Sequence, residues 1–544
     1  MKREKIIEIL TIQHDIFITP NIIKKLEELD ESLIYKIRDI AIQKNIKILD
    51  ENFLNEILGN KKEEIKIEKK EEKRGILSFI SSKKEVLVQI NKEIVEIHEE
   101  KKRRIGEEIE TKIEEVEKIN RKINVLKKFD VQKNKIDITT WVSYYKARLN
   151  KIKKILKEHN ELKTIYPLDK IPEKEDVGIA GIIYDKRLTD KGIIFIIEDG
   201  NKKLKVFVDK NSEEIDFKLV KDIPLDSVIG FYGRYNKDKD LFFATKVIYP
   251  DVPIKKIKTY GEEDVYILFT GDWQVGNRHT IDILFDRFIR FLNAKTGNSN
   301  LDNLSRKIGY VLIIGDNVDG VGIYPSQESE LVLKTYEEQY KKFEEYLLKI
   351  PEEIKVALIP GNHDIPRLAE PQPPLPKSLL EEAYKMKNIF FLSNPSYIKV
   401  HDSLTVLMYH GYVLDWLVSQ IQILREKGGY ENPGELMKFL LMLRLLNPSH
   451  GSTAYVPYFN EDPLVIDEVP DIFHTGHIHR ATYNEYKGID LVNSSTFQDI
   501  TPYQIEIGHK PIPGILFLRN IKDGSVLALN LFDYSLHKIR DKVI

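Results

Sequence analysis

Residues Tyr310 to Gly320 read YVLIIGDNVDG, and this stretch decides the fold. The run YVLII is short, apolar and rich in β-branched residues, which is typical of a strand buried on both faces. It ends in a glycine followed by two aspartates, Asp316 and Asp319. Because ligands in open α/β sheets bind beyond the carboxyl ends of the strands, the stretch predicts an α/β sheet with a polar site at its rim.

Similar apolar runs recur along the second half of the chain. They span residues 265–269, 354–359, 404–409, 471–473, 491–492 and 515–518. Helical patterns at 281–292 and 331–348 lie between them. The alternation predicts an α/β sandwich with buried sheets, flanked by helices.

Several of these runs end in a short polar motif. The motifs are Gly271-Asp272-Trp273-Gln274, Gly315-Asp316, Gly361-Asn362-His363-Asp364, Tyr409-His410-Gly411, Gly476-His477-Ile478-His479 and Asn493-Ser494-Ser495. Five strands thus deliver carboxylate, amide and imidazole groups to one rim. Two divalent ions about 3.5–4 Å apart need a bridging carboxylate and several terminal ligands, and Asp316 is the natural bridge. The mixed donor set suits manganese, iron or zinc better than calcium. His477 and His479 are expected to lie on an extended segment, with both rings on one face.

These motifs resemble the calcineurin-like metallophosphoesterase superfamily. The resemblance implies a first metal site of Asp272, Gln274, Asp316 and His479, and a second of Asp316, Asn362, His410 and His477. It implies that His363 contacts the scissile phosphate, that Asp364 orients His363, and that Asp319 supports ligands without binding metal. Arg367, directly after the third motif, is a candidate phosphate contact, with a structural ion pair as the alternative.

Gln274 departs from the superfamily pattern, which has histidine at this position. A glutamine carbonyl ligates hard cations but is a poorer donor than imidazole for manganese or zinc. Two interpretations stay open: a weakened or metal-selective nuclease, and an inactive scaffold. His279 is a candidate replacement ligand. His474 is expected to be a hydrogen-bonded core residue, and His401, His450 and His509 are expected at the surface or in turns.

A narrower resemblance rests on residues 315–325 (GDNVDGVGIYP), 360–374 (PGNHDIPRLAEPQPP) and 474–479 (HTGHIH). These stretches are similar to the small subunits of archaeal family D DNA polymerases, and the order of parts along the chain is similar too. The resemblance implies a 3′→5′ exonuclease that uses two divalent metals, with Mn²⁺ favoured. It implies a large polymerase subunit and a DNA primer 3′ end as partners, with a sliding clamp as a further candidate. The alternatives are an inactive B-type scaffold subunit and a free-standing repair nuclease or phosphatase.

The rest of the chain divides into three parts. Residues 1–59 predict a small helical module, and residues 60–138 predict a Lys/Glu-rich linker, either flexible or a single solvated helix. Within it, residues 61–74 cannot bury enough apolar surface to fold alone. Residues 139–258 predict a helix followed by five short strands, which suit an OB-type barrel; residues 259–544 hold the phosphoesterase motifs. Of the barrel's aromatic residues, most are expected in the core. Both nucleic-acid binding and a scaffold role stay open for it.

Composition excludes several classes of protein. The formal net charge of −2 over 544 residues excludes a globally basic nucleic-acid coat, so a DNA contact has to be local. The chain has no cysteine, which excludes disulfides, thiolate metal sites and thiol nucleophiles. No signal-peptide core or membrane span is apparent, so a cytoplasmic location without a membrane partner is expected.

Overall fold

The computed structural model describes residues 121–130, 135–173, 175–256 and 263–542, and before these only residues 17–18, 26, 34, 36–38, 40–41 and 48–49. The chain divides into two compact units, Met1–Ile113 and Glu114–Ile544. In the first unit β1 (Phe17–Ile18) pairs in parallel with β2 (Ile48–Leu49). The described residues between these strands are helical, as the sequence predicts there. The remainder of the helical module, and the linker up to residue 120, lie outside the described residues.

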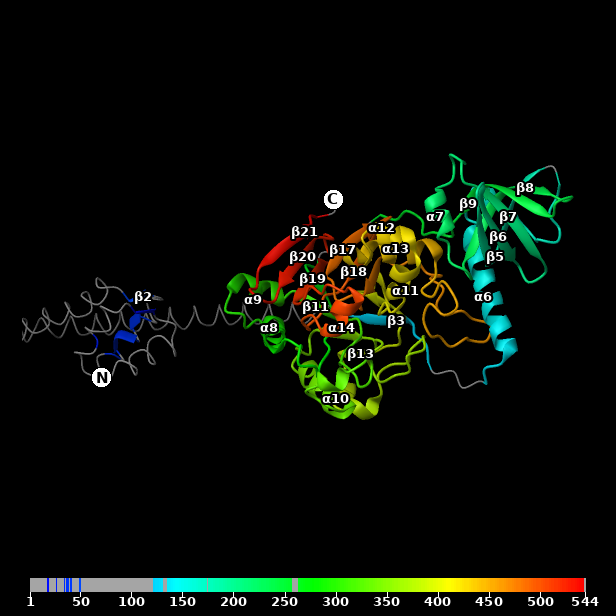
Figure 1. Ribbon diagram of the computed structural model, residues 1–544. Helices are drawn as coiled ribbons and strands as arrows, with labels where there is room; N and C mark the ends of the chain where they lie inside the picture. The colour runs from blue at the N-terminus through cyan, green and yellow to red at the C-terminus, as the bar shows by residue number, and fades with distance from the viewer. Residues whose placement is uncertain are drawn as a thin grey trace, which may run out of the picture. The chain divides into compact units, whose positions relative to one another are not determined.

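The second unit contains a closed barrel, which agrees with the predicted OB-type domain (Figure 1). Its strands are β4 (Ile165–Tyr166), β5 (Asp176–Thr189), β6 (Gly192–Glu198), β7 (Lys203–Asp209), β8 (Val228–Asn236) and β9 (Leu241–Ile248). The barrel closes because the long strand β5 pairs with both β6 and β8. The β6–β7 turn is held by Asp199, whose side chain accepts the backbone N–H groups of Asn201 and Lys202. Phe195, Phe231 and Phe242 are buried in the core, whereas Phe243 is partly exposed.

Helix α6 (Ile138–Leu156) precedes the barrel. Its first turn is capped by Asp137, which accepts the backbone N–H of Thr140 at 3.0 Å. Its Arg148 is fully buried and pairs with Asp462 of the following domain at 2.6 Å. A charge pair buried to this degree positions the helix firmly against that domain.

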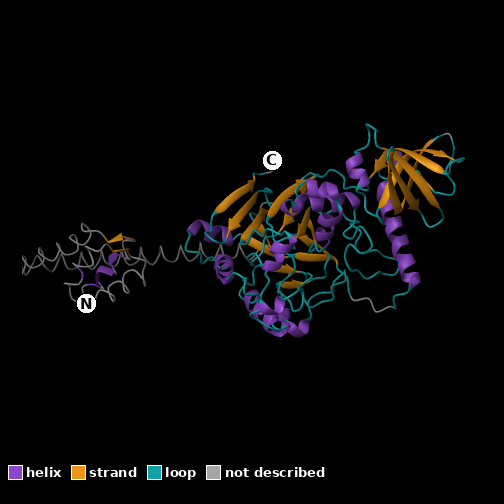
Figure 2. Cartoon of the chain, in the orientation of Figure 1, coloured by secondary structure: helices purple, strands orange, loops and turns teal. Residues whose placement is uncertain are grey.

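The C-terminal domain is a sandwich of two sheets with helices on the outside, which confirms the predicted fold class (Figure 2). The first sheet has the order β13-β12-β11-β10-β19-β20-β21 and the second the order β17-β18-β16-β15-β14-β3. The first sheet consists of β10 (Tyr266–Thr270), β11 (Ile308–Ile313), β12 (Lys355–Leu358), β13 (Ile389–Phe391), β19 (Ile515–Asn520), β20 (Val526–Asn530) and β21 (Leu536–Arg540). The second consists of β3 (Ile123–Lys127), β14 (Ser396–Val400), β15 (Leu404–Met408), β16 (Ile472–Thr475), β17 (Thr482–Tyr486) and β18 (Ile489–Asn493).

Strand β3 corrects the predicted linker boundary at residue 138. It pairs antiparallel with β14 as the edge of the second sheet, and Ile123 is buried between the two sheets. Phe129, just beyond the strand, is buried as well. The high lysine content of this stretch hides the strand, because an edge strand carries charged side chains on its solvent face.

Eight further α-helices follow α6 in the part of the chain that the structure describes. They are α7 (Phe217–Lys221), α8 (Asp282–Leu292), α9 (Ser299–Ser305), α10 (Tyr336–Leu347), α11 (Val413–Gln420), α12 (Gln422–Glu426), α13 (Pro433–Leu443) and α14 (Pro502–Ile507), with α7 belonging to the barrel. Among the residues that the structure describes, no helix is long and apolar enough to cross a membrane.

Candidate metal centre

The predicted ligands meet at the carboxyl ends of five strands. Asp272 follows β10, Asp316 follows β11, Asn362 follows β12, His410 follows β15 and His477 follows β16. Strands β10, β11 and β12 run parallel in one sheet, and β15 and β16 run parallel in the other. The two sheets therefore present their strand ends to one shared rim, as the motif positions predict.

The loops that carry the ligands have unusual backbone conformations. Asp272, Gln274, Asp316, His477 and His479 all have φ between 47° and 68°. Non-glycine residues rarely adopt this left-handed region, and they hold it only where the surroundings enforce it. Here the loops bond to each other: the Asp272 N–H donates to the Gly315 carbonyl at 2.9 Å, and the Gln274 N–H donates to the Asp316 carbonyl at 3.1 Å. The extended segment predicted for the last two histidines is thus wrong; their loop is a compact turn.

Two glycines allow the close approach of these loops. A Cβ added to Gly361 would meet Oδ1 of Asp316 at 2.2 Å, and one added to Gly476 would meet Oδ2 of Asp272 at 2.3 Å. Both distances are well below 3.0 Å, and real Cβ atoms essentially never come that close to another heavy atom. Glycine is therefore required at these positions if the carboxylates are to keep their places.

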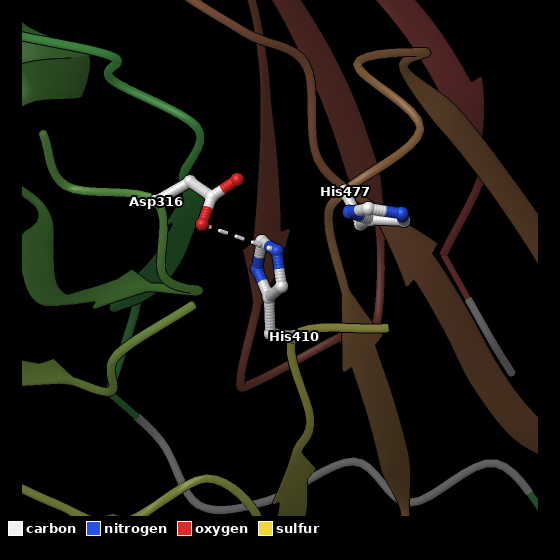
Figure 3. A group of neighbouring side chains, drawn as sticks. All are labelled: Asp316, His410 and His477. Atoms are coloured by element: carbon white, nitrogen blue, oxygen red, sulfur yellow. Dashed lines mark ion pairs between the residues drawn. The ribbon is translucent and has the colours of Figure 1, made fainter. Parts of the chain in front are cut away.

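Two groups of candidate metal ligands share Asp316. One consists of Asp316, His410 and His477, and the other of Asp272, Asp316 and His479. Within each group the ligand atoms lie within 4.8 Å of one another, and every member is buried. Figure 3 shows the first of these groups, with the carboxylate of Asp316 directed toward the ring of His410. Asp316 occupies the position expected of a carboxylate that bridges two ions.

The ring of His410 is oriented for coordination through Nε2. Its Nδ1 donates to the Ile314 carbonyl at 2.8 Å, because a carbonyl can only accept. Its Nε2 faces Oδ1 of Asn362 at 2.9 Å and Oδ1 of Asp316 at 3.4 Å. Burial disfavours a charged ring, but the neighbouring carboxylate outweighs this effect and raises the pKa of His410 to about 10. A proton therefore lies between Nε2 and these oxygens, and a cation bound there would displace it.

His477 is held by a residue that no sequence motif indicated. Its Nε2 lies 2.9 Å from Oδ2 of Asp415 in α11, and the second oxygen of Asp415 lies 3.2 Å from Nε2 of His509. Burial alone would raise the pKa of Asp415, but the two imidazoles hold it below its ordinary value. The carboxylate keeps the proton of His477 on Nε2, so that Nδ1 is free for a metal. The expectation that His509 lies at the surface is wrong, because it is buried in this contact.

The first predicted site is built differently. Nε2 of His479 lies 3.5 Å from Oδ1 of Asp272 and 3.2 Å from the side-chain amide nitrogen of Gln274. The same amide nitrogen donates to Oδ2 of Asp316 at 3.1 Å. Oε1 of Gln274 is buried without a hydrogen-bond partner. His279, the candidate replacement, is in neither group of ligands among the described residues.

His363 lies beside the shared carboxylate. Its Nδ1 donates to the Asp319 carbonyl at 2.8 Å, which leaves Nε2 3.8 Å from Oδ2 of Asp316. Its orientation therefore comes from the backbone of Asp319, and the expectation that Asp364 orients it is wrong. Asp364 instead accepts the N–H of Gly361 at 2.8 Å and the hydroxyl of Tyr340 at 2.8 Å. Burial, together with the charge of Asp316, raises the pKa of Asp364 to about 6.

Asp319 and Arg367 have structural contacts. The carboxylate of Asp319 accepts from the amides of Asn277, Gln327 and Gln498. It is buried and belongs to neither ligand group of the described residues, in keeping with the expected supporting role. Arg367 donates to the carbonyls of Ala369 and Pro371 within its own loop, so it stabilises that loop through carbonyls rather than through an ion pair.

The remaining histidines follow expectation more closely. His474 is fully buried, and its Nε2 lies 2.7 Å from the hydroxyl of Ser494. Burial lowers the pKa of His474 to about 3, as expected of a neutral core residue. His450 is exposed and lies 2.9 Å from the Tyr455 hydroxyl, whereas His401 lies 3.1 Å from the Tyr310 hydroxyl in a turn.

A cavity of about 160 Å³ opens over the ligands. Asp316, Asn362, His363 and His477 line its floor. Tyr324 and Tyr503 line its wall and stack on each other with ring centres 5.0 Å apart. An aromatic wall next to a carboxylate and imidazole floor is suited to a ligand with a flat ring and a phosphate.

The fold and the rim together define a class of protein. A two-sheet sandwich whose strand ends present aspartate, asparagine and histidine is the calcineurin-like phosphoesterase fold. A family model that describes the B subunits of DNA polymerases alpha and epsilon matches residues 297–484. Among solved structures, Vacuolar Protein Sorting 29 from Cryptosporidium parvum is similar, with 13% identity, 52% of this chain and 99% of that chain covered, and a TM-score of 0.26.

Curated relatives identify the family. The DNA polymerase II small subunit of Methanocaldococcus jannaschii is 37% identical over 388 residues, which are 71% of this chain and 64% of that protein. The Archaeoglobus fulgidus protein of the same name is 32% identical over 430 residues, which are 78% of this chain and 83% of that protein. The Methanothermobacter thermautotrophicus protein is 34% identical, with 68% of this chain and 74% of that protein covered. The chain belongs to the family of DNA polymerase II small subunits.

Proposed function

We propose that this chain is the 3′→5′ exonuclease subunit of a family D-type DNA polymerase and that it hydrolyses the 3′-terminal phosphodiester of a primer. Membership of the small-subunit family supports a large polymerase subunit as its partner. The observation that carries the hydrolytic part is the pair of buried ligand groups that share Asp316 beneath a cavity. The match covers 64% of the length of the Methanocaldococcus jannaschii relative. The activity and the partners of a whole small subunit are therefore proposed for this chain.

The residues of the site have distinct proposed roles. Asp316, Asn362, His410 and His477 would hold a divalent ion, which would supply Lewis-acid activation of the phosphodiester. His363, held by the Asp319 carbonyl, presents Nε2 to the cavity and, when protonated, donates to a phosphate oxygen or the leaving oxygen. Tyr503 and Tyr324 offer a stacking surface for the terminal base.

A scaffold role is the second candidate function. Gln274 favours it, because this residue replaces an imidazole in the first site and brings an amide N–H toward Asp316. The intact second group of ligands favours retained chemistry, since Asp316, His410 and His477 are all buried and lie together at distances that suit a metal ion.

The test is exonuclease activity on a 3′-mismatched primer–template with Mn²⁺. The wild type is compared with Asp316→Ala and with Asp499→Ala, an exposed aspartate of the same domain that serves as control. Activity that is lost only in Asp316→Ala supports the proposal. If wild type and Asp316→Ala show the same background, alone and with the large subunit added, the exonuclease proposal fails and the scaffold role replaces it.

A further inference from the structure

The three histidines among the candidate ligands differ in one respect: the group that faces the ring nitrogen on the side away from the metal position. For His410 this partner is a carbonyl, and for His477 it is the carboxylate of Asp415. Both partners accept a hydrogen bond, so the ring proton stays on that nitrogen and the other nitrogen keeps a lone pair for a metal. For His479 the partner is the side-chain amide nitrogen of Gln504, 2.8 Å from Nδ1. This amide nitrogen is a donor.

The orientation of the Gln504 amide is determined by the helix it belongs to. Gln504 is the third residue of α14, and its Oε1 accepts the backbone N–H of Thr501 at 3.0 Å in a capping box. A backbone N–H can only donate, so the oxygen must face Thr501 and the nitrogen must face His479. Nδ1 of His479 is consequently an acceptor, and the ring proton lies on Nε2.

A proton on Nε2 removes the lone pair through which His479 would ligate the first metal. Gln274 adds to this effect. In one orientation its amide nitrogen donates to Asp316, but then it confronts the N–H of His479 and leaves Oε1 buried without a partner. In the other orientation Oε1 accepts from His479 but lies against the Asp316 carboxylate. Gln274 thus directs its own N–H into the first site, and Gln504 causes His479 to direct a ring N–H there, where a cation needs lone pairs.

We infer that this chain binds one divalent ion tightly, at the second site, and that Gln274 and Gln504 weaken the first site by at least about 100-fold relative to it. The inference rests on the ligand assignment of the proposed function but not on nuclease activity. It assigns to Gln504, which also lines the cavity, the role of setting the tautomer of a ligand.

The test is calorimetric titration of the metal-free full chain with Mn²⁺ in the absence of DNA. We expect one tight equivalent in the wild type. Gln504→Glu keeps the helix cap, because a carboxylate oxygen still accepts from Thr501, but it now places an acceptor at Nδ1 of His479. Combined with Gln274→His, it is expected to tighten the second equivalent by about 10- to 100-fold. Gln420→Glu, an exposed glutamine of α11, is the matched control and should leave one tight equivalent.

A second readout is independent of the heat signal. Two Mn²⁺ ions that share a carboxylate couple magnetically, so the double variant with two equivalents should show a coupled-pair resonance spectrum that the wild type with one equivalent lacks. Two equivalents of similar affinity in the wild type overturn the inference, as does a double variant that stays at one. No tight equivalent in any variant overturns the ligand assignment itself, and the proposed function with it. One tight equivalent without exonuclease activity overturns only the proposed function.

Discussion

The carboxylate of Asp415 receives hydrogen bonds from two imidazoles, and Nε2 of His477 lies 2.9 Å from one of its oxygens. The two residues are 62 positions apart in the chain and belong to α11 and to the loop after β16. A metal-binding imidazole usually has such an acceptor on its other nitrogen, which fixes the ring and increases its basicity. The contact therefore holds the ring of His477 as the proposed role of metal ligand requires.

Replacing Asp415 tests this relationship. Asp415→Ala should raise the Kd of the tightly bound Mn²⁺ by about 10- to 100-fold, because the ring of His477 loses its fixed tautomer and orientation. Asp415→Asn should have a smaller effect, since the amide oxygen still accepts a hydrogen bond. Calorimetric titration measures both, with Asp499→Ala as control. An unchanged Kd in Asp415→Ala would contradict the proposed role.

Removal of His363 should separate chemistry from metal binding. His363→Ala is expected to lower the exonuclease rate by about 10²- to 10⁴-fold, the range typical of a lost proton donor. The Kd for Mn²⁺ should change little, because the ring lies outside both ligand groups. Single-turnover cleavage and metal titration on the same preparation distinguish these effects. Weakened metal binding without a loss of rate at saturating Mn²⁺ would show that His363 acts on the metal instead.

The buried pair between Arg148 and Asp462 should dominate the attachment of α6. Arg148 also donates to the Tyr144 hydroxyl and to the Asn447 carbonyl, so its removal leaves several buried acceptors without a partner. Arg148→Ala should lower the free energy of unfolding by about 3–5 kcal/mol. Arg148→Met, which keeps the packing volume, combined with Asp462→Leu should recover part of this loss. Urea denaturation followed by circular dichroism measures both, and a loss below about 1 kcal/mol would contradict the argument.

Glu370 should make stability depend on pH. It is buried, its Oε1 has no partner, and burial raises its pKa from the ordinary 4.5 to about 7. The folded state then binds this proton more tightly than the unfolded state, so the contribution of Glu370 to the free energy of unfolding falls as pH rises from about 4.5 to about 7. Over this pH range the contribution of Glu370 to the free energy of unfolding changes by at most about 3 kcal/mol.

The measurement compares urea denaturation at pH 5 and pH 8 with chelator present. Glu370→Gln should reduce the difference in the free energy of unfolding between the two pH values. Its stability relative to wild type should therefore be greater at pH 8 than at pH 5. Glu506→Gln, an exposed glutamate, should keep the wild-type difference. Equal pH dependence in wild type and Glu370→Gln would show that the carboxylate is not the cause.

Local patterns sufficed to predict much of this molecule. The apolar runs identified seven strands of the sandwich, and alternation identified all five main strands of the barrel, because buried strands and half-buried strands have direct signatures. The positions of Asp316, His410 and His477 at strand ends followed from the geometry of parallel sheets. These features depend only on residues close together in the chain, and the sequence by itself determined them.

Tertiary structure decided the rest. Strand β3 takes part in the sheet only because β14 offers an edge, and its own residues resemble a linker. Asp415 and Gln504 carry no motif, yet they set the proton positions of His477 and His479 across 62 and 25 residues of chain. Which nitrogen of an imidazole keeps its lone pair depends on the group that faces the other nitrogen. That group is chosen by the packing of distant elements, and no local pattern records it.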